Sequence, residues 1–209
     1  GTISIQDFVP MWINATMSFT VKDGNLVLDQ AEIETDGAHT TAHGLIDLAR
    51  WPEQTHTVDS HVNFQRMREL FFAREPWQLS GDGNFAGTFH LFRGGHDLTG
   101  DFESAAAGVD AYRFQDLYGS LQWNRQFFEV TNAGADLYGG DAQFGFSIRP
   151  QGQGRPSLAG FSTTFTNVDA AELSDVHELP GLRIAANASG THAVEWPLGR
   201  FSANRGEGQ

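Results

Sequence analysis

Residues 127–148 decide the fold of this chain, and they read FFEVTNAGADLYGGDAQFGFSI. Apolar residues alternate with polar or small ones on both sides of Gly139-Gly140, and a period of two places every second side chain on the same face of a strand. Glycines between two alternating runs are typical of a turn. The stretch therefore predicts β-strands that carry their phenylalanines on one face.

The same alternation recurs along most of the chain. Met17, Phe19 and Val21 alternate with polar residues up to Asp23-Gly24, and apolar residues resume at the same period after this turn. With 17 Phe, 24 Gly and only 19% charged residues, the composition favours strands and turns over helices. We therefore expect a mainly β protein with a strongly aromatic sheet face. The residues expected on this face are Phe85, Phe89, Phe102, Trp123, Phe128, Val130, Leu137, Phe144, Phe146, Ile148, Phe161 and Phe165.

Two segments break the period of two and predict short helices. Residues 64–74 place apolar side chains on one helical stripe and are followed by Pro76. Residues 169–179 begin with Asp169, which can cap a first turn, and are followed by Pro180-Gly181. Because strand pattern follows each segment, we expect both helices to cover part of a sheet.

An internal repeat with an offset of about 102 residues relates the two halves of the chain. This offset carries Ala31 to Ala133 and Gly37 to Gly139, and it keeps the alternating pattern while few identities are retained. Stacked repeats contact only their neighbours, so the repeat predicts an elongated molecule. The expected units are a first β-repeat over residues 1–97, a second over residues 98–200 and a polar tail over residues 201–209.

The charge and the absence of cysteine exclude several classes of protein. Lys and Arg number 13 against 26 Asp and Glu, which gives a net charge of −13. Such a chain repels phosphate backbones and anionic membrane surfaces, and no run of basic residues offsets this charge, so we expect no nucleic-acid partner. Without cysteine the chain forms no disulfide, thiolate metal site or cysteine nucleophile.

Residues 127–148 and a second signature together resemble a known family. The second signature is the segment VDAAEL at residues 168–173, followed by Pro-Gly-Leu and by a strand that runs into Ser189-Gly190-Thr191. Both are similar to the periplasmic repeats of the AsmA/TamB-like proteins of diderm bacteria, which are bridge-like lipid transport proteins. The resemblance covers most of the chain and implies that the chain is an internal fragment of such a protein.

The resemblance implies a long, twisted antiparallel sheet curled into a taco-like trough with an apolar concave face. It implies a periplasmic protein, anchored in the inner membrane in its full length, that carries phospholipid acyl chains toward the outer membrane and supports outer-membrane biogenesis. The TamB branch also has an outer-membrane assembly barrel as partner. Such a conduit is not an enzyme and needs no cofactor.

The residues alone do not decide what covers the aromatic face. A closed core in a β-sandwich would cover it, and an extracellular sandwich of this kind could use its Trp residues and acidic clusters to bind carbohydrate, or carry a hydrolase site. Two short helices, however, cover only a few strands, which would leave part of the face open for an acyl chain. With the resemblance, we expect the twelve residues named above to line a lipid-binding groove.

Other candidate motifs favour structural roles. His39 and His43 are four apart on an expected strand, a poor spacing for one metal ion, and no third ligand is near them in sequence. Asp97, Asp101 and Glu103 share one strand face opposite the apolar residues, which is typical of a solvated surface. Residues 81–87 nearly match a dinucleotide-binding fingerprint, but strand alternation continues through them. We therefore expect no metal site and no catalytic residues.

Overall fold

The computed structural model describes residues 2–8, 11–176 and 185–209. Within these ranges the chain forms one 13-stranded sheet in which the strand order follows the sequence. The strands are β1 (Thr2–Phe8), β2 (Met11–Lys22), β3 (Asn25–Thr35), β4 (Ala38–Asp47), β5 (Gln54–Asn63), β6 (Leu79–Phe92), β7 (Gly95–Val109), β8 (Tyr112–Asn124), β9 (Phe128–Leu137), β10 (Gly140–Arg149), β11 (Leu158–Asp169), β12 (Asn187–Pro197) and β13 (Arg205–Gly208).

Two short α-helices interrupt the strands of the described ranges, α1 (Phe64–Phe71) and α2 (Ala170–Val176). The side chain of Asn63 caps α1 by accepting a hydrogen bond from the Arg66 backbone N–H at 2.9 Å, and Asp169 caps the first turn of α2. The two expected helices are thus confirmed, although α1 ends before residue 74 and residues 177–179 lie outside the described ranges. No helix in the described part of the chain is long and apolar enough to cross a membrane.

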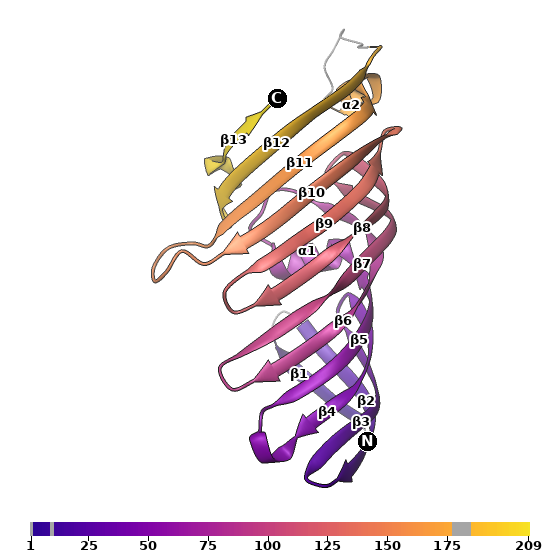
Figure 1. The fold of residues 1–209 in the computed structure, drawn as a ribbon, viewed down its shortest axis with the longest axis vertical. Coiled ribbons are helices and arrows are strands. Elements are labelled where there is room, and N and C mark those ends of the chain that lie inside the picture. The colour runs from indigo at the N-terminus through magenta and orange to yellow at the C-terminus, as the bar shows by residue number, and fades with distance from the viewer. Residues whose placement is uncertain (1, 9–10, 177–184) are drawn as a thin grey trace.

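Consecutive strands pair antiparallel, so the connections between them alternate between two rims of the sheet. We call one the helix rim, because it carries α1 and α2 together with the turns at residues 36–37, 110–111 and 138–139. We call the other the hairpin rim. It carries the connections at residues 23–24, 48–53, 93–94, 125–127, 150–157 and 198–204, which include the short 3-10 helices η1 (Leu48–Arg50) and η2 (Phe201–Ala203). Figure 1 shows the strands running obliquely between these rims.

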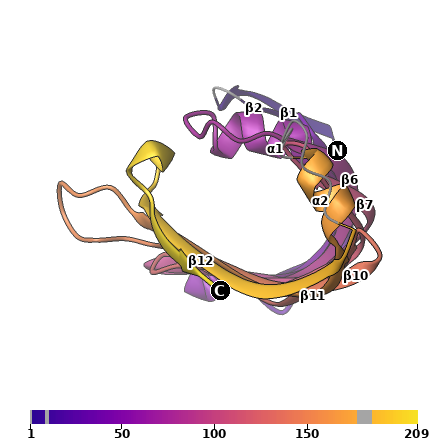
Figure 2. The same cartoon turned by 90° about the horizontal axis from the view of Figure 1, so that it is seen from above.

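The sheet is twisted and curled into an open arc, and α1 and α2 lie inside this arc (Figure 2). Strands β1 and β13 are the two ends of the strand order and do not pair with each other, so the sheet is not closed. The predicted elongated, antiparallel, trough-like sheet is therefore confirmed. A two-sheet sandwich, the arrangement that the residues alone left open, is not formed by the described strands.

The internal repeat is visible in the strand register. The pairing of β3 with β4 is interrupted by a bulge between Leu28 and Ala31, and the pairing of β9 with β10 is interrupted between Val130 and Ala133. These equivalent positions, 28 with 130 and 31 with 133, each differ by 102. The two halves therefore share their bulges as well as their order of strands, and one continuous sheet joins them.

Residues 201–209, expected as a polar tail, contain η2 and the edge strand β13. β13 pairs with β12 between His192 and Glu195, and all four of its residues are exposed. Sequence alternation could not reveal this strand because the segment has no apolar face.

Candidate functional site

The twelve residues expected on the aromatic face share one face of the sheet. The register places Phe146 opposite both Phe161 on β11 and Val130 on β9, and places Phe85 opposite Phe102. This face is the concave one, because a Cβ added at Gly83, two residues before Phe85, would lie 2.6 Å from the ring of Phe64 on α1. Since α1 lies inside the arc, the phenylalanines face the trough (Figure 2).

Most of this concave face is only partly covered by protein. Of the twelve residues only Leu137 is buried, while Trp123 is 41% exposed and the other ten are half-buried. Val168 is the one large apolar side chain of the described residues that is completely buried. A single curved sheet with two short helices therefore leaves a broad aromatic surface in contact with water, which is unfavourable unless something covers it.

Ring contacts connect this surface across several strands. The centroids of Phe128 and Phe146 are 6.0 Å apart, those of Phe146 and Trp196 are 6.1 Å apart, and those of Trp196 and Phe201 are 5.1 Å apart. These rings come from β9, β10, β12 and η2, so the contacts run perpendicular to the strands. The ring contacts are therefore continuous from β9 to η2, across the strands at the C-terminal end of the trough.

A segment at residues 72–78, which we call the strap, begins and ends at the helix rim, and its middle reaches the hairpin rim at Gly199. Glu75 in the strap is 2% exposed, and its Oε1 accepts hydrogen bonds from Trp196 Nε1 at 3.2 Å and from the Gly199 backbone N–H at 2.6 Å. The other oxygen, Oε2, is buried without a hydrogen-bond partner. The strap thus covers Trp196, which is 4% exposed, and joins residues more than 120 positions apart.

Arg68 and two aromatic rings hold the strap to α1. Arg68 donates hydrogen bonds to the backbone carbonyls of Trp77, at 2.9 Å, and of Glu75. The rings of Phe72 and Trp77 pack with centroids 5.3 Å apart. The sequence singled out neither Arg68 nor Glu75 as a functional or linking residue.

An ion-pair network attaches α1 to the turn between β3 and β4. Arg66 donates hydrogen bonds to Asp36 in that turn and to Glu69 on α1, the latter at 2.6 Å. The hydrogen bond from Arg66 is the main reason that the pKa of each of these carboxyls is lowered, and the two carboxylates together raise the pKa of Arg66. All three groups are charged at neutral pH and position the helix.

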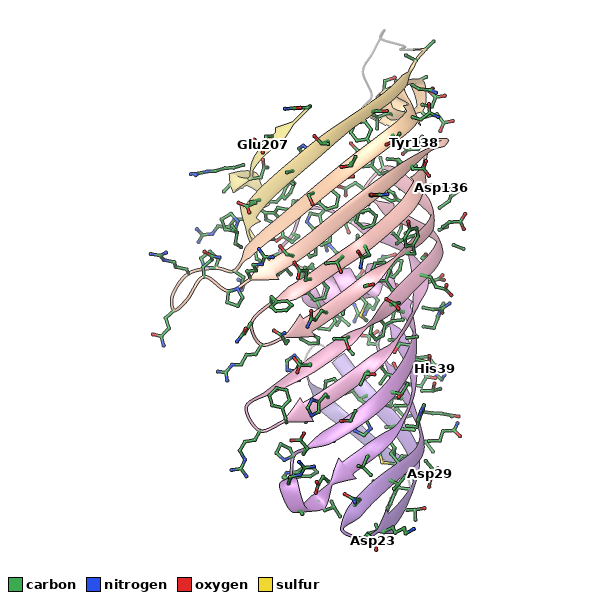
Figure 3. All side chains as sticks on the ribbon, in the orientation of Figure 1. Asp23, Asp29, His39, Asp136, Tyr138 and Glu207 are labelled. Carbon is green, nitrogen blue, oxygen red and sulfur yellow. The ribbon has the colours of Figure 1, made fainter. Side chains whose placement is uncertain are left out.

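The convex face is polar, and Asp29, His39 and Asp136 lie on it (Figure 3). His39 and His43 are both exposed, and His39 Nδ1 lies 2.5 Å from Glu34 Oε1. Asp101 and Glu103 are exposed as expected, and Asp97 is partly covered. Among the described residues no group of three or more His, Asp or Glu side chains lies close enough together to hold a metal ion.

His56 is a buried polar side chain on the concave face of the first repeat. Its Nε2 lies 2.9 Å from Gln54 Oε1, whereas Nδ1 is buried without a hydrogen-bond partner. Burial lowers the pKa of His56 below its usual range, because the charged imidazolium loses hydration there. The ring is therefore neutral at neutral pH.

Two cavities in the described part of the molecule lie away from the phenylalanines. One of about 530 Å³ is lined by polar residues near the turn after β9, including Arg113, Asp136 and Glu172. The other, of about 300 Å³, is lined by residues of β3 and β4, including Asp29 and His43. The aromatic face, most of whose residues are half-buried, is an open surface, which suits an extended ligand better than a small compact one.

Comparison with known proteins gives no match: no family model, no curated protein and no solved structure is similar to this chain. The assignment of a function therefore depends on the geometry described above.

Proposed function

We propose that this chain is a segment of a lipid-conduit protein, in which phospholipid acyl chains lie along the concave aromatic face. The observation that carries the proposal is the incomplete covering of that face, where ten of the twelve expected lining residues are half-buried and Trp123 is exposed. An acyl chain needs apolar contacts and no hydrogen-bond partners, and these side chains offer such contacts over several consecutive strands.

Transfer along a continuous apolar surface has a physical advantage over transfer through water. Each CH₂ group returned to water costs about 0.8 kcal/mol, so a tail that stays on the rings avoids a large barrier. The resemblance to AsmA/TamB-like repeats supports the same function and a location in the periplasm between the inner and outer membranes, where the chain would serve outer-membrane biogenesis. An outer-membrane assembly barrel is a partner that this proposal includes.

A photo-crosslinking experiment in cells tests the proposal. A photoreactive amino acid at Phe146 is expected to give phospholipid adducts, because this side chain lies on the concave face. The matched control is Ser147, the next residue of the same strand, whose side chain points to the opposite face. Absence of adducts at Phe146 in folded protein at its native level, or equal adducts at both positions, contradicts the proposal.

A further inference from the structure

The cations of this acidic chain are divided unequally between the two rims. Each hairpin-rim connection has at least one Lys or Arg in it or at its edge, although the chain has only 13 such residues in total. Scattered through the sequence, these residues form no basic run, and the alternation of the connections brings them to one side of the sheet. They are Lys22, Arg50, Arg93, Arg125, Arg149, Arg155, Arg200 and Arg205.

Three arginines on the described part of the helix rim are bound to other parts of the protein. Arg66 pairs with Asp36 and Glu69, and Arg68 donates to carbonyls of the strap. Arg113 donates to the carbonyls of Asp110 and Tyr112 at 2.7 and 2.9 Å. These cations therefore have structural roles.

Five arginines of the hairpin rim have no carboxylate partner within the described residues, and all five are exposed: Arg93, Arg125, Arg155, Arg200 and Arg205. They lie in or at the edge of four successive hairpin-rim connections, from the one between β6 and β7 to the one between β12 and β13. Because neighbouring strands are about 4.8 Å apart, successive connections on one rim are spaced by roughly 10 Å. These unpaired arginines, which we call the arginine row, therefore run beside the aromatic part of the concave face.

The row keeps like charges near one another without internal compensation. Arg125 Nη1 donates a hydrogen bond to the carbonyl of Gly94 at 3.3 Å, which brings it to the connection that carries Arg93. Arg74, at the start of the strap, lies against Gly199, next to Arg200: a Cβ added at Gly199 would be 3.5 Å from Arg74 Cβ. Neighbouring cations of this kind favour an anionic ligand.

Three carboxylates at this rim pair with other groups, and one of them is Glu53, whose Oε1 lies 2.8 Å from His90 Nε2. Asp47 and Glu129 pair with Arg50 and Arg149 at 2.7 and 3.1 Å. Asp23 and Glu207 lie at opposite ends of the molecule, beyond the central connections (Figure 3). Arg93, Arg125 and Arg155 thus lie between Asp23 and Glu207 along the molecule.

We propose that the arginine row of the hairpin rim binds the phosphate of anionic lipid headgroups while the acyl chains of the same lipids lie on the concave face. This inference rests on the proposed function and adds a substrate class and an orientation to it. A guanidinium group can form two parallel hydrogen bonds with a phosphate. An exposed single contact of this kind is weak, but a tail held on the rings keeps the phosphate at the rim at a high effective concentration.

Lipid selectivity tests the row. The protein is incubated with vesicles that contain phosphatidylglycerol, phosphatidylcholine and diacylglycerol with identical acyl chains, then repurified, and the retained lipids are quantified by mass spectrometry. We expect severalfold enrichment of phosphatidylglycerol over diacylglycerol, and loss of most of this enrichment in the variant Arg93→Gln/Arg125→Gln. Retention of diacylglycerol should not change.

The matched control is Arg50→Gln/Arg149→Gln, which removes the same charge from the same rim but from arginines that have carboxylate partners. This control is expected to keep the enrichment, and thermal unfolding checks that both variants fold. An equal loss in both variants would show that net charge, rather than the unpaired row, sets the preference, and would overturn the inference.

Four further outcomes separate this inference from the proposed function. Equal retention of all three lipids by the wild-type protein would contradict headgroup binding by the arginine row but not the proposed conduit. Retention of none of them would contradict the conduit itself. Sedimentation with phosphatidylglycerol vesicles without lipid uptake identifies docking on a membrane surface and overturns the inference. Micromolar binding of inorganic phosphate to lipid-free protein in calorimetry identifies a free-phosphate site and also overturns it.

Discussion

Equivalent positions in the two repeats carry different side chains on the concave face. Ala42 and Gly44 on β4 correspond at an offset of 102 to Phe144 and Phe146 on β10. The strands around both pairs have the same bulge and order, so the backbone curvature does not depend on these side chains. Turns and bulges therefore determine the curvature of the trough, while the side chains on its concave face determine which ligand it can bind.

In the first repeat, small residues leave the space in which α1 packs. The second repeat has more space for large aromatic side chains. α1 lies close enough to β6 and to the turn before β4 that Gly37 and Gly83 leave no room for a Cβ. In the second repeat nothing lies within 4 Å of a Cβ added at Gly139, the equivalent of Gly37, and most of the rings are half-buried. The aromatic part of the trough therefore lies mainly over β6 to β12, beside the unpaired arginines.

The largest expected effect comes from breaking the link between the repeats at Glu75. Glu75→Ala leaves the buried Trp196 Nε1 and the Gly199 N–H without an acceptor, and we expect a loss of about 3 kcal/mol in the free energy of unfolding. Urea denaturation measures this loss, and hydrogen exchange should show increased opening at β12 and η2. The control Glu69→Ala removes a partly exposed ion pair and should cost much less, because solvent screens exposed ion pairs. Equal losses in the two variants would contradict a linking role for the strap.

The turn glycines at equivalent positions give a matched pair of substitutions. Gly37 and Gly139 both have positive φ, 108° and 74°, so alanine is strained at either position. At Gly37 a Cβ would also meet Arg66 Cγ at 2.6 Å, whereas at Gly139 nothing lies within 4 Å. We expect Gly139→Ala to destabilise the protein by about 1 kcal/mol and Gly37→Ala by about 2 kcal/mol or more. Thermal unfolding measures both values, and a larger loss at Gly139 would refute the claim that α1 constrains the first repeat.

Local sequence pattern was sufficient to predict the strands, the helices and the identity of the aromatic face. Alternation around Asp23-Gly24 and Gly139-Gly140 depends on residues close in sequence, and so do helix caps such as Asp169. The strap and the arginine row could not be predicted in this way. Glu75 meets Trp196 only because the curled sheet brings its two rims together, and Arg93 and Arg125 become neighbours only when each strand pair returns to the same rim. A cation near each second turn of the strand pattern was the one available sequence signal of the row.

A double substitution can give the second repeat the small side chains of the first. Phe144→Ala/Phe146→Ala removes two half-buried rings, and we expect lipid retention after vesicle incubation to fall about tenfold, which corresponds to roughly 1.4 kcal/mol of lost apolar contact. The control Phe19→Ala removes a ring that is 51% exposed in the first repeat and should leave retention nearly unchanged. Retention that falls equally in both variants would show that the two repeats contribute alike.

The smallest expected effect concerns the pH dependence of stability, and it distinguishes His56 from Phe161, the side chain at the equivalent position of the second repeat. The register sets His56 opposite Gly44 and sets Phe161 opposite Phe146, so the two side chains occupy matching positions in the two repeats. His56 lies between uncharged partners, Gly44 on one side and Phe89 on the other, and Gln54 is its hydrogen-bond partner.

Because burial lowers the folded-state pKa of His56, the unfolded chain binds a proton first as the pH falls through about 6.5, the usual imidazole pKa. His56 therefore leaves the free energy of unfolding unchanged above that pH and reduces it below. In the variant His56→Phe this acid-side loss, less than about 1 kcal/mol, should be absent. Urea denaturation between pH 7.5 and 5 measures the difference. The exposed His43→Gln is the control and should retain the wild-type profile. If the free energy of unfolding of His56→Phe falls on the acid side with the same slope as that of the wild type, another group is responsible for the loss. The buried His56 would then contribute no more to the pH dependence than Phe161, which matches it in the second repeat.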